Sequence, residues 1–188
     1  MHIVSILTKS VVIACSLTNK GFPAIHGPLA MSAHKTSPDR IELDDLPGYH
    51  IRRLQQIAVA LFLQEAEPFG VTPVQYAALK GVASAPGADQ RTLARTIGLD
   101  TSTTGGVVDR LEARGLLLRS AKPEDRRVRL LTLTREGREL LERVTPAMLR
   151  AQQRILEPLP AAQRKQFLRM LRTLVETNNA LSRAPSEA

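Results

Sequence analysis

The sequence predicts a mainly α-helical fold in which six helices are interrupted by one two-stranded β hairpin. Three observations predict this class. After residue 48, apolar residues recur at helical spacing over most of the chain. Aromatic residues make up only 3% and Trp is absent, so the core must be aliphatic, a composition that suits packed helices. A short stretch rich in Leu and β-branched residues lies between the fourth and fifth helical segments, where a hairpin is expected.

The boundaries of the elements follow from turn and capping residues. Pro47-Gly48 precedes the first helix, and Thr72 is an N-cap with Pro73 at the first helical position. Asp89 caps a short helix that ends at Gly98. The expected helices cover 49–66, 72–85, 90–97, 100–114, 135–157 and 160–182, and the expected strands cover 116–120 and 127–134.

The length of 188 residues fits one domain with extensions. Residues 1–45 are expected to be a disordered N-terminal extension, with translation starting at Met31, and 183–188 a tail. A signal peptide is the alternative, but Lys9 splits its apolar stretch and no Lys or Arg precedes it.

Cysteine and histidine are scarce. Cys15 is the single cysteine, which excludes an internal disulfide, and the cytoplasm is the expected compartment. After residue 50 the sequence offers no His/Cys metal cluster. No metal, cofactor or catalytic residue is therefore expected. A membrane is not among the expected partners either.

The charge pattern indicates a polyanionic partner. The net charge is +8, which favours nucleic acid or an anionic surface. Residues 89–138 carry eleven Lys and Arg against seven Asp and Glu, so eleven minus seven gives +4, half of the total.

Residues 89–114 have the pattern of a helix-turn-helix. Ala94 supplies a small residue where two helices cross, and Gly98 suits a turn of positive φ. Four consecutive hydroxyl residues, 101–104, open the second helix and could donate to phosphates or base edges. An ordinary αα-hairpin and a simple capping cluster are the alternatives.

The hairpin that follows is basic at its tip, with Lys122, Arg126, Arg127 and Arg129. Arginines on a β turn can enter the narrow minor groove of DNA. A solvated charged turn is the alternative. Directly after a helix-turn-helix, the hairpin is interpreted as a wing, so the predicted fold is a winged helix-turn-helix.

Three segments resemble one known family. Residues 109–116 read DRLEARGL, 123–127 read PEDRR, and 131–137 read LTLTREG. This combination resembles the MarR (multiple antibiotic resistance regulator) family over about residues 46–180. The resemblance implies a homodimer joined by the long terminal helices, 46–70 and 135–182, and a DNA-binding domain over 71–134. It also implies a transcriptional regulator, by default a repressor, on a pseudo-palindromic operator in double-stranded DNA.

The resemblance also implies roles for single residues. In the family's Asp-x-Arg wing pattern, the arginine enters the minor groove and the aspartate fixes the wing, which corresponds to Arg127 and Asp125. One departure is Gly105-Gly106, where relatives often carry a large polar or basic residue. Two glycines cost roughly 2 kcal/mol of helix propensity relative to Ala. The candidate DNA-binding residues are Thr101, Ser102, Thr103, Thr104, Arg110, Lys122, Asp125, Arg126, Arg127 and Arg129.

The segment 46–56, LPGYHIRRLQQ, resembles a branch that controls the breakdown of aromatic acids, including repressors of nicotinate degradation. This implies a small aromatic carboxylate effector such as 6-hydroxynicotinate. Arginine and histidine suit a carboxylate, so the candidate effector-binding residues are His50, Arg53, Gln75 and Tyr76. Alternatively, Arg52 and Arg53 form salt bridges between subunits and Tyr76 belongs to the core.

Two other function classes are alternatives to a transcriptional regulator. An enzyme is disfavoured because no phosphate loop, HExxH or nucleophile elbow is present, and His50 is the only histidine after the N-terminal region. A winged-helix module for protein contacts without an effector is the second alternative. Such a module would not require a basic wing.

Overall fold

The computed structural model describes residues 42–122, 125, 128–182 and 184. Six helices and one antiparallel hairpin confirm the predicted fold class. The elements are α1 Pro47–Ala66, α2 Pro73–Ser84, α3 Gln90–Ile97, α4 Thr101–Ala113, β1 Leu117–Ala121, β2 Arg129–Leu133, α5 Arg135–Leu156 and α6 Ala161–Thr177. Short 3-10 turns occupy Leu43–Asp45, Glu67–Phe69 and Asn179–Leu181.

The last helix is shorter than expected. The sequence predicts a helix to residue 182, but α6 ends at Thr177. The side-chain amide of Asn178 donates to the Leu174 carbonyl over 2.8 Å, which satisfies a carbonyl at the end of the helix. A 3-10 turn then replaces the expected last turn of the helix.

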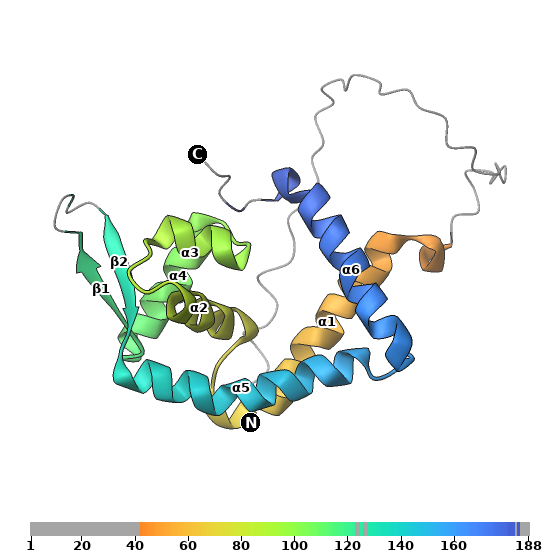
Figure 1. Ribbon diagram of the computed structural model, residues 1–188, viewed down its shortest axis with the longest axis horizontal. Coiled ribbons are helices and arrows are strands. Elements are labelled where there is room, and N and C mark those ends of the chain that lie inside the picture. The colour runs from red at the N-terminus through yellow and green to blue at the C-terminus, as the bar shows by residue number, and fades with distance from the viewer. Residues whose placement is uncertain (1–41, 123–124, 126–127, 183, 185–188) are drawn as a thin grey trace, which may run out of the picture. The chain divides into compact units, whose positions relative to one another are not determined.

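The core lies in a lobe made of α2, α3, α4, β1 and β2, here called the winged-helix lobe. In Figure 1 this lobe packs above the first half of α5, whereas α1 and α6 lie beside the second half. Leucines from all five elements of the lobe are almost fully buried, namely Leu79, Leu93, Leu111, Leu117 and Leu131. Val144 of α5 is equally buried, so α5 closes the core from below.

Capping residues start the helices of the lobe where the sequence predicts. Thr72 and Gln75 form a reciprocal capping box at α2. The Asp89 carboxylate accepts from the Thr92 amide at α3 over 2.7 Å. These bonds satisfy amide groups that a helix start would otherwise leave without partners.

Two glycines help to position the helix-turn-helix, one through its backbone conformation and one through a close contact. Gly98 has φ +71° and ends α3 in the left-handed region, as predicted. Gly81 of α2 is a feature that the sequence analysis missed. A Cβ there would lie 2.7 Å from Leu93 Cδ1 of α3, so any larger residue would require the buried Leu93 side chain to move.

The hairpin is fixed to the helix-turn-helix by backbone bonds. Leu117 pairs with Leu133 and Ala121 with Arg129, and Leu117, Leu131 and Leu133 turn inward to the core. Gly87 donates to the Leu131 carbonyl over 2.9 Å, and the Leu131 amide donates to Ala88 over 3.0 Å. The base of the hairpin therefore cannot move independently of the α2–α3 connection.

The other half of the molecule is held differently. Glu65 of α1 accepts from Arg150 at 2.8 Å and from Arg154 at 3.0 Å, both on α5. Those two arginine hydrogen bonds lower the pKa of the Glu65 carboxyl.

Helix α6 contains no buried residue. Among the described residues, no helix has the length and apolar character that crossing a membrane requires.

Candidate DNA-binding surface and effector cavity

The N-terminal end of α4 presents hydroxyl groups at the surface. Thr101, Ser102 and Thr103 are exposed. Asp100 caps the helix: its carboxylate accepts from the Thr103 hydroxyl at 2.6 Å and from the Thr103 amide at 2.8 Å. These two bonds lower the pKa of Asp100, so the cap is a carboxylate at neutral pH. The expected hydroxyl surface therefore consists of Thr101 and Ser102, with Thr103 partly committed to the cap.

The expectation that Thr104 contacts DNA is wrong. Its side chain is 0% exposed, and its hydroxyl donates to the Asp100 carbonyl over 2.9 Å. Thr104 shares a helix face with the buried Val107, Val108 and Leu111. This spacing of three, four and seven residues was visible in the sequence and would have placed Thr104 in the core.

The wing is described in part. Lys122, Asp125 and Arg129 are exposed, as a DNA-contacting hairpin requires. The Asp125 carbonyl accepts from the Val128 amide over 3.0 Å, and the Lys122 amide donates to the Val128 carbonyl over 3.0 Å. Arg126 and Arg127 lie outside the described residues, so their predicted role stays a prediction.

Arg119 of β1 is a residue that the sequence analysis missed. Its guanidinium lies 2.6 Å from Asp109 and 3.2 Å from Glu112, both on α4. Only 22% of the Arg119 side chain is exposed, whereas the Asp109 and Glu112 side chains are 65% and 38% exposed, so these ion pairs are partly accessible to solvent and salt. These ion pairs link the first strand of the wing to α4. Two acids three residues apart, followed by an arginine on the next strand, were the available signal.

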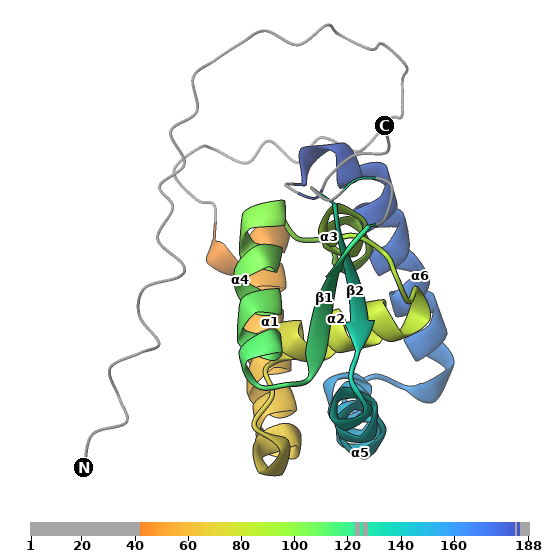
Figure 2. The same cartoon turned by 90° about the vertical axis from the view of Figure 1, so that its left-hand side faces the viewer.

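Figures 1 and 2 show how α4 and the hairpin lie together. In Figure 2 the hairpin and α4 stand side by side in front, with α5 seen end-on below them. The two strands of the hairpin extend away from α5. The lobe therefore offers a helix and a hairpin on one side, which is the arrangement that a winged helix needs to contact two adjacent grooves.

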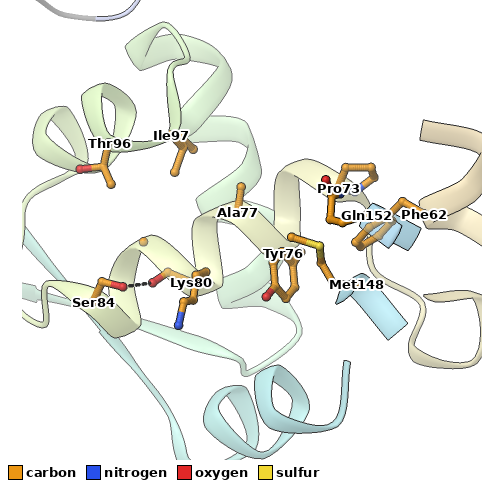
Figure 3. Close-up of a pocket in the computed structure, with 11 residues that line it drawn as sticks. Phe62, Pro73, Tyr76, Ala77, Lys80, Ser84, Thr96, Ile97, Met148 and Gln152 are labelled. Atoms are coloured by element: carbon orange, nitrogen blue, oxygen red, sulfur yellow. Dashed lines mark hydrogen bonds between the residues drawn. The ribbon is translucent and has the colours of Figure 1, made fainter. Parts of the chain in front are cut away.

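A cavity of about 470 Å³ lies where the winged-helix lobe meets α1 and α5. Figure 3 shows Tyr76 and Met148 on one side, with Phe62 and Gln152 beyond them, and Thr96 and Ile97 of α3 across from Ala77. The rings of Phe62 and Tyr76 lie 6.1 Å apart, centre to centre. Lys80 is the single charged residue in its lining. The full lining is Phe62, Pro73, Tyr76, Ala77, Lys80, Gly81, Ser84, Thr96, Ile97, Met148 and Gln152.

The four predicted effector residues are not brought together in this chain. Tyr76 lines the cavity. The Gln75 side chain is buried, accepts from the Thr72 amide in the capping box and is absent from the lining, so its role in effector binding stays a prediction. His50 and Arg53 are exposed on α1: Nε2 of His50 donates to the Asp44 carbonyl at 2.7 Å, and Arg53 donates to the Tyr49 hydroxyl at 3.2 Å. Neither lines the cavity. In the described part of the chain, no cluster of His, Cys, Asp and Glu could hold a metal ion.

The fold and the surface of α4 and the hairpin define a winged helix-turn-helix DNA-binding protein. A sequence profile of the MarR family matches residues 71–128. A protein of Thauera aromatica, named as a transcriptional regulator of the hcr operon, is 33% identical over 156 residues, covering 77% of this chain and 92% of that protein. The chain belongs to the MarR family and is a DNA-binding transcriptional repressor.

Solved structures show the same fold. The repressor CouR, bound to a 23-mer DNA duplex, superposes with a TM-score of 0.67 at 34% identity, covering 71% of this chain and 94% of CouR. Bordetella bronchiseptica BpsR, whose DNA binding is regulated by 6-hydroxynicotinic acid, superposes with a TM-score of 0.69 at 30% identity. That alignment covers 72% of this chain and 96% of BpsR.

Proposed function

We propose that this repressor acts as a homodimer on a pseudo-palindromic operator and releases it when a small aromatic carboxylate binds. We further propose that the regulated genes serve the catabolism of such acids, with 6-hydroxynicotinate as the first candidate effector. Since a repressor must reach the chromosome, the proposed site of action is the cytoplasm.

The proposal assigns the DNA contacts to α4 and the wing. Exposed hydroxyls at the start of α4 can donate to base edges and phosphates. Exposed cations at the wing, including Lys122 and Arg129, can neutralise phosphates. The Arg119 pairs link the first strand of the wing to α4, so both parts can enter neighbouring grooves together. Relatedness to CouR, which was solved on a DNA duplex, supports this assignment.

The proposal assigns dimerisation to the terminal helices, 46–70 and 135–182. Helix α6 leaves large apolar side chains at the surface of the single chain, among them Met170, Leu174 and Val175 at 58%, 54% and 65% exposure. Ile51 and Ile57 of α1 are also exposed. An apolar surface of this kind is typical of a protein interface, and a twofold dimer would cover it with the same surface of a second copy.

The cavity carries the effector proposal. Its volume of about 470 Å³ lies within the range of small-molecule sites, about 300–1,000 Å³. The lining combines the rings of Phe62 and Tyr76 with the cation of Lys80, which suits an aromatic ring that bears a carboxylate.

The position of the cavity supplies a mechanism for release. The lining comes from α2 and α3 of the DNA-binding lobe and from α1 and α5 of the terminal helices. A ligand that binds best at one relative placement of these two parts favours that placement. Because α3 packs on α4, a shift of α3 would change the spacing of the two recognition helices in the dimer. BpsR, regulated by 6-hydroxynicotinic acid, supports this reading.

A gel-shift assay tests the effector site. The probe is the duplex upstream of the gene, titrated with 6-hydroxynicotinate and with benzoate. We expect Lys80→Gln to bind DNA normally but to need at least about tenfold more ligand for release, because a charge-assisted hydrogen bond is lost. The matched comparison is Arg53→Gln, which removes the cation predicted from sequence. Normal release in Lys80→Gln together with impaired release in Arg53→Gln would show that the carboxylate binds at α1 and not in the cavity.

A further inference from the structure

Gly105 and Gly106, in the middle of α4, the proposed recognition helix, have different neighbours. A Cβ on Gly105 would lie 3.0 Å from Nε2 of Gln90, whose amide donates to the Thr101 carbonyl over 3.2 Å. Gly105 therefore makes room for a contact between α3 and α4. A Cβ on Gly106 would meet a different group, Nη1 of Arg110, at 3.8 Å. The Arg110 guanidinium thus lies beside the bare backbone of Gly106.

Arg110 differs from the other arginines around α4. Arg119 is paired with Asp109 and Glu112, and Arg114 donates to the Gly70 carbonyl over 2.8 Å. Within the described residues, the exposed Arg110 guanidinium has neither an acidic partner nor a hydrogen bond. Its five donors remain available to a ligand.

The direction of the Arg110 side chain follows from helix geometry. Side chains on a helix lean toward its N-terminus, so Arg110 covers the turn that begins at Gly106. That turn adjoins the hydroxyl residues Thr101 and Ser102, which are proposed to face the DNA. A large side chain at position 106 would occupy the space where the guanidinium lies. Because Gly106 has no side chain, the Arg110 side chain can lie along the helix surface toward the N-terminus of α4.

We propose that Arg110 is a specificity-determining residue that recognises a guanine in each half-site of the operator. A planar guanidinium fork matches the O6 and N7 acceptors of guanine in the major groove, the commonest specific contact between proteins and DNA. This inference rests on the proposed binding of α4 in the major groove. In this proposal Arg110, which lies over Gly106, recognises the base. A side chain at position 106 does not.

Selection from a pool of 30-base-pair duplexes with a randomised centre tests the inference. We expect the wild-type protein to enrich duplexes with an invariant guanine at one position of each half-site. Replacing that guanine with 7-deazaguanine removes the N7 acceptor and should weaken wild-type binding about tenfold. Arg110→Lys keeps the charge but loses the fork, so it should bind the two duplexes equally well. Arg95→Lys, at an exposed arginine of α3, is the matched control and should respond to 7-deazaguanine like the wild type.

Substitutions of Gly106 test whether the Arg110 side chain needs this free space. Gly106→Ala places a methyl group at ordinary contact distance and should keep the guanine preference. Gly106→Leu should reduce it to less than about threefold while circular dichroism shows a folded protein. A guanine preference that is unchanged in both Arg110→Lys and Gly106→Leu would overturn the inference and leave the proposed DNA binding intact. Failure of the wild type to enrich any duplex would overturn both.

Discussion

The winged-helix lobe and helix α6 obtain their stability from different sources. In the lobe, leucines from five elements are almost fully buried within one chain. Helix α6 has no fully buried residue and leaves Met170, Leu174 and Val175 largely exposed. The lobe therefore buries its core within one chain, together with α1 and α5, whereas α6 needs another surface to bury its apolar face. We therefore expect substitutions in the core of the lobe to unfold the protein, and substitutions on the exposed face of α6 to dissociate the proposed dimer.

The largest expected effect on stability is at the contact between the start of α5 and the backbone of Leu116, which joins α5 to the winged-helix lobe. A Cβ on Gly137 of α5 would overlap the carbonyl oxygen of Leu116, a backbone atom that cannot rotate away. We expect Gly137→Ala to lower the free energy of unfolding by more than about 3 kcal/mol in urea denaturation. Gly48→Ala is the control, because a Cβ at Gly48 meets nothing within 4 Å. Equal stability of the two variants would contradict the close packing of Gly137 against Leu116.

The next effect concerns α6. Leu174→Asp places a charge on the exposed apolar face, and we expect the dissociation constant of the dimer to rise about 100-fold in analytical ultracentrifugation, as for an interface hot spot. The fold should persist, because Leu174 belongs to no core within the chain. Lys165→Asp lies nine residues away, on the opposite face of α6, and should leave the dimer intact. A monomeric wild type, or a dimer unaffected by Leu174→Asp, would refute the proposed role of α6.

The smallest effect is a pH dependence within the lobe. The backbone hydrogen bond from Thr92 lowers the pKa of Asp89 below its ordinary value of 3.8. A carboxyl whose pKa is lower in the folded state stabilises that state above the unfolded pKa, and the contribution is lost as the pH falls through the folded pKa. We expect about 0.3–1 kcal/mol to be lost as the pH falls from roughly 5 through the lowered pKa, because protonation removes the charge at the helix N-terminus but keeps an acceptor oxygen.

Asp89→Asn separates this cap from the other acids of the chain. Asparagine caps a helix about as well as aspartate but does not titrate in this range. The variant should therefore show a flatter decline in the free energy of unfolding, measured by urea titration at pH 6, 4 and 3. An identical decline in the variant and the wild type would show that Asp89 does not contribute to the acid sensitivity.

Local signals in the sequence were sufficient for most of the fold. The caps at Thr72 and Asp89 and the left-handed Gly98 act within one turn of their own position, so they could be identified without tertiary structure. The end of α6 was placed too late, because apolar spacing continues through Leu181 although Asn178 terminates the helix.

The candidate site was harder to predict because its contacts join distant segments. Arg119 matters through two acids on the preceding helix. Lys80 enters the effector proposal only because α1, α2, α3 and α5 enclose one cavity. The capping role of Gln75 could have been predicted, because its partner Thr72 lies three residues earlier. Long-range packing decides such cases, and spacing along one helix does not reveal it.

A salt titration of DNA binding tests the central claim most directly, namely that two copies of the lobe bind one duplex through α4 and the wing. The measurement is the fluorescence anisotropy of the upstream duplex across a range of salt concentrations. Neutralising about eight phosphates predicts a log–log slope of affinity against salt near −7, with two chains bound per duplex. A slope near zero, or one chain per duplex, would contradict the claim.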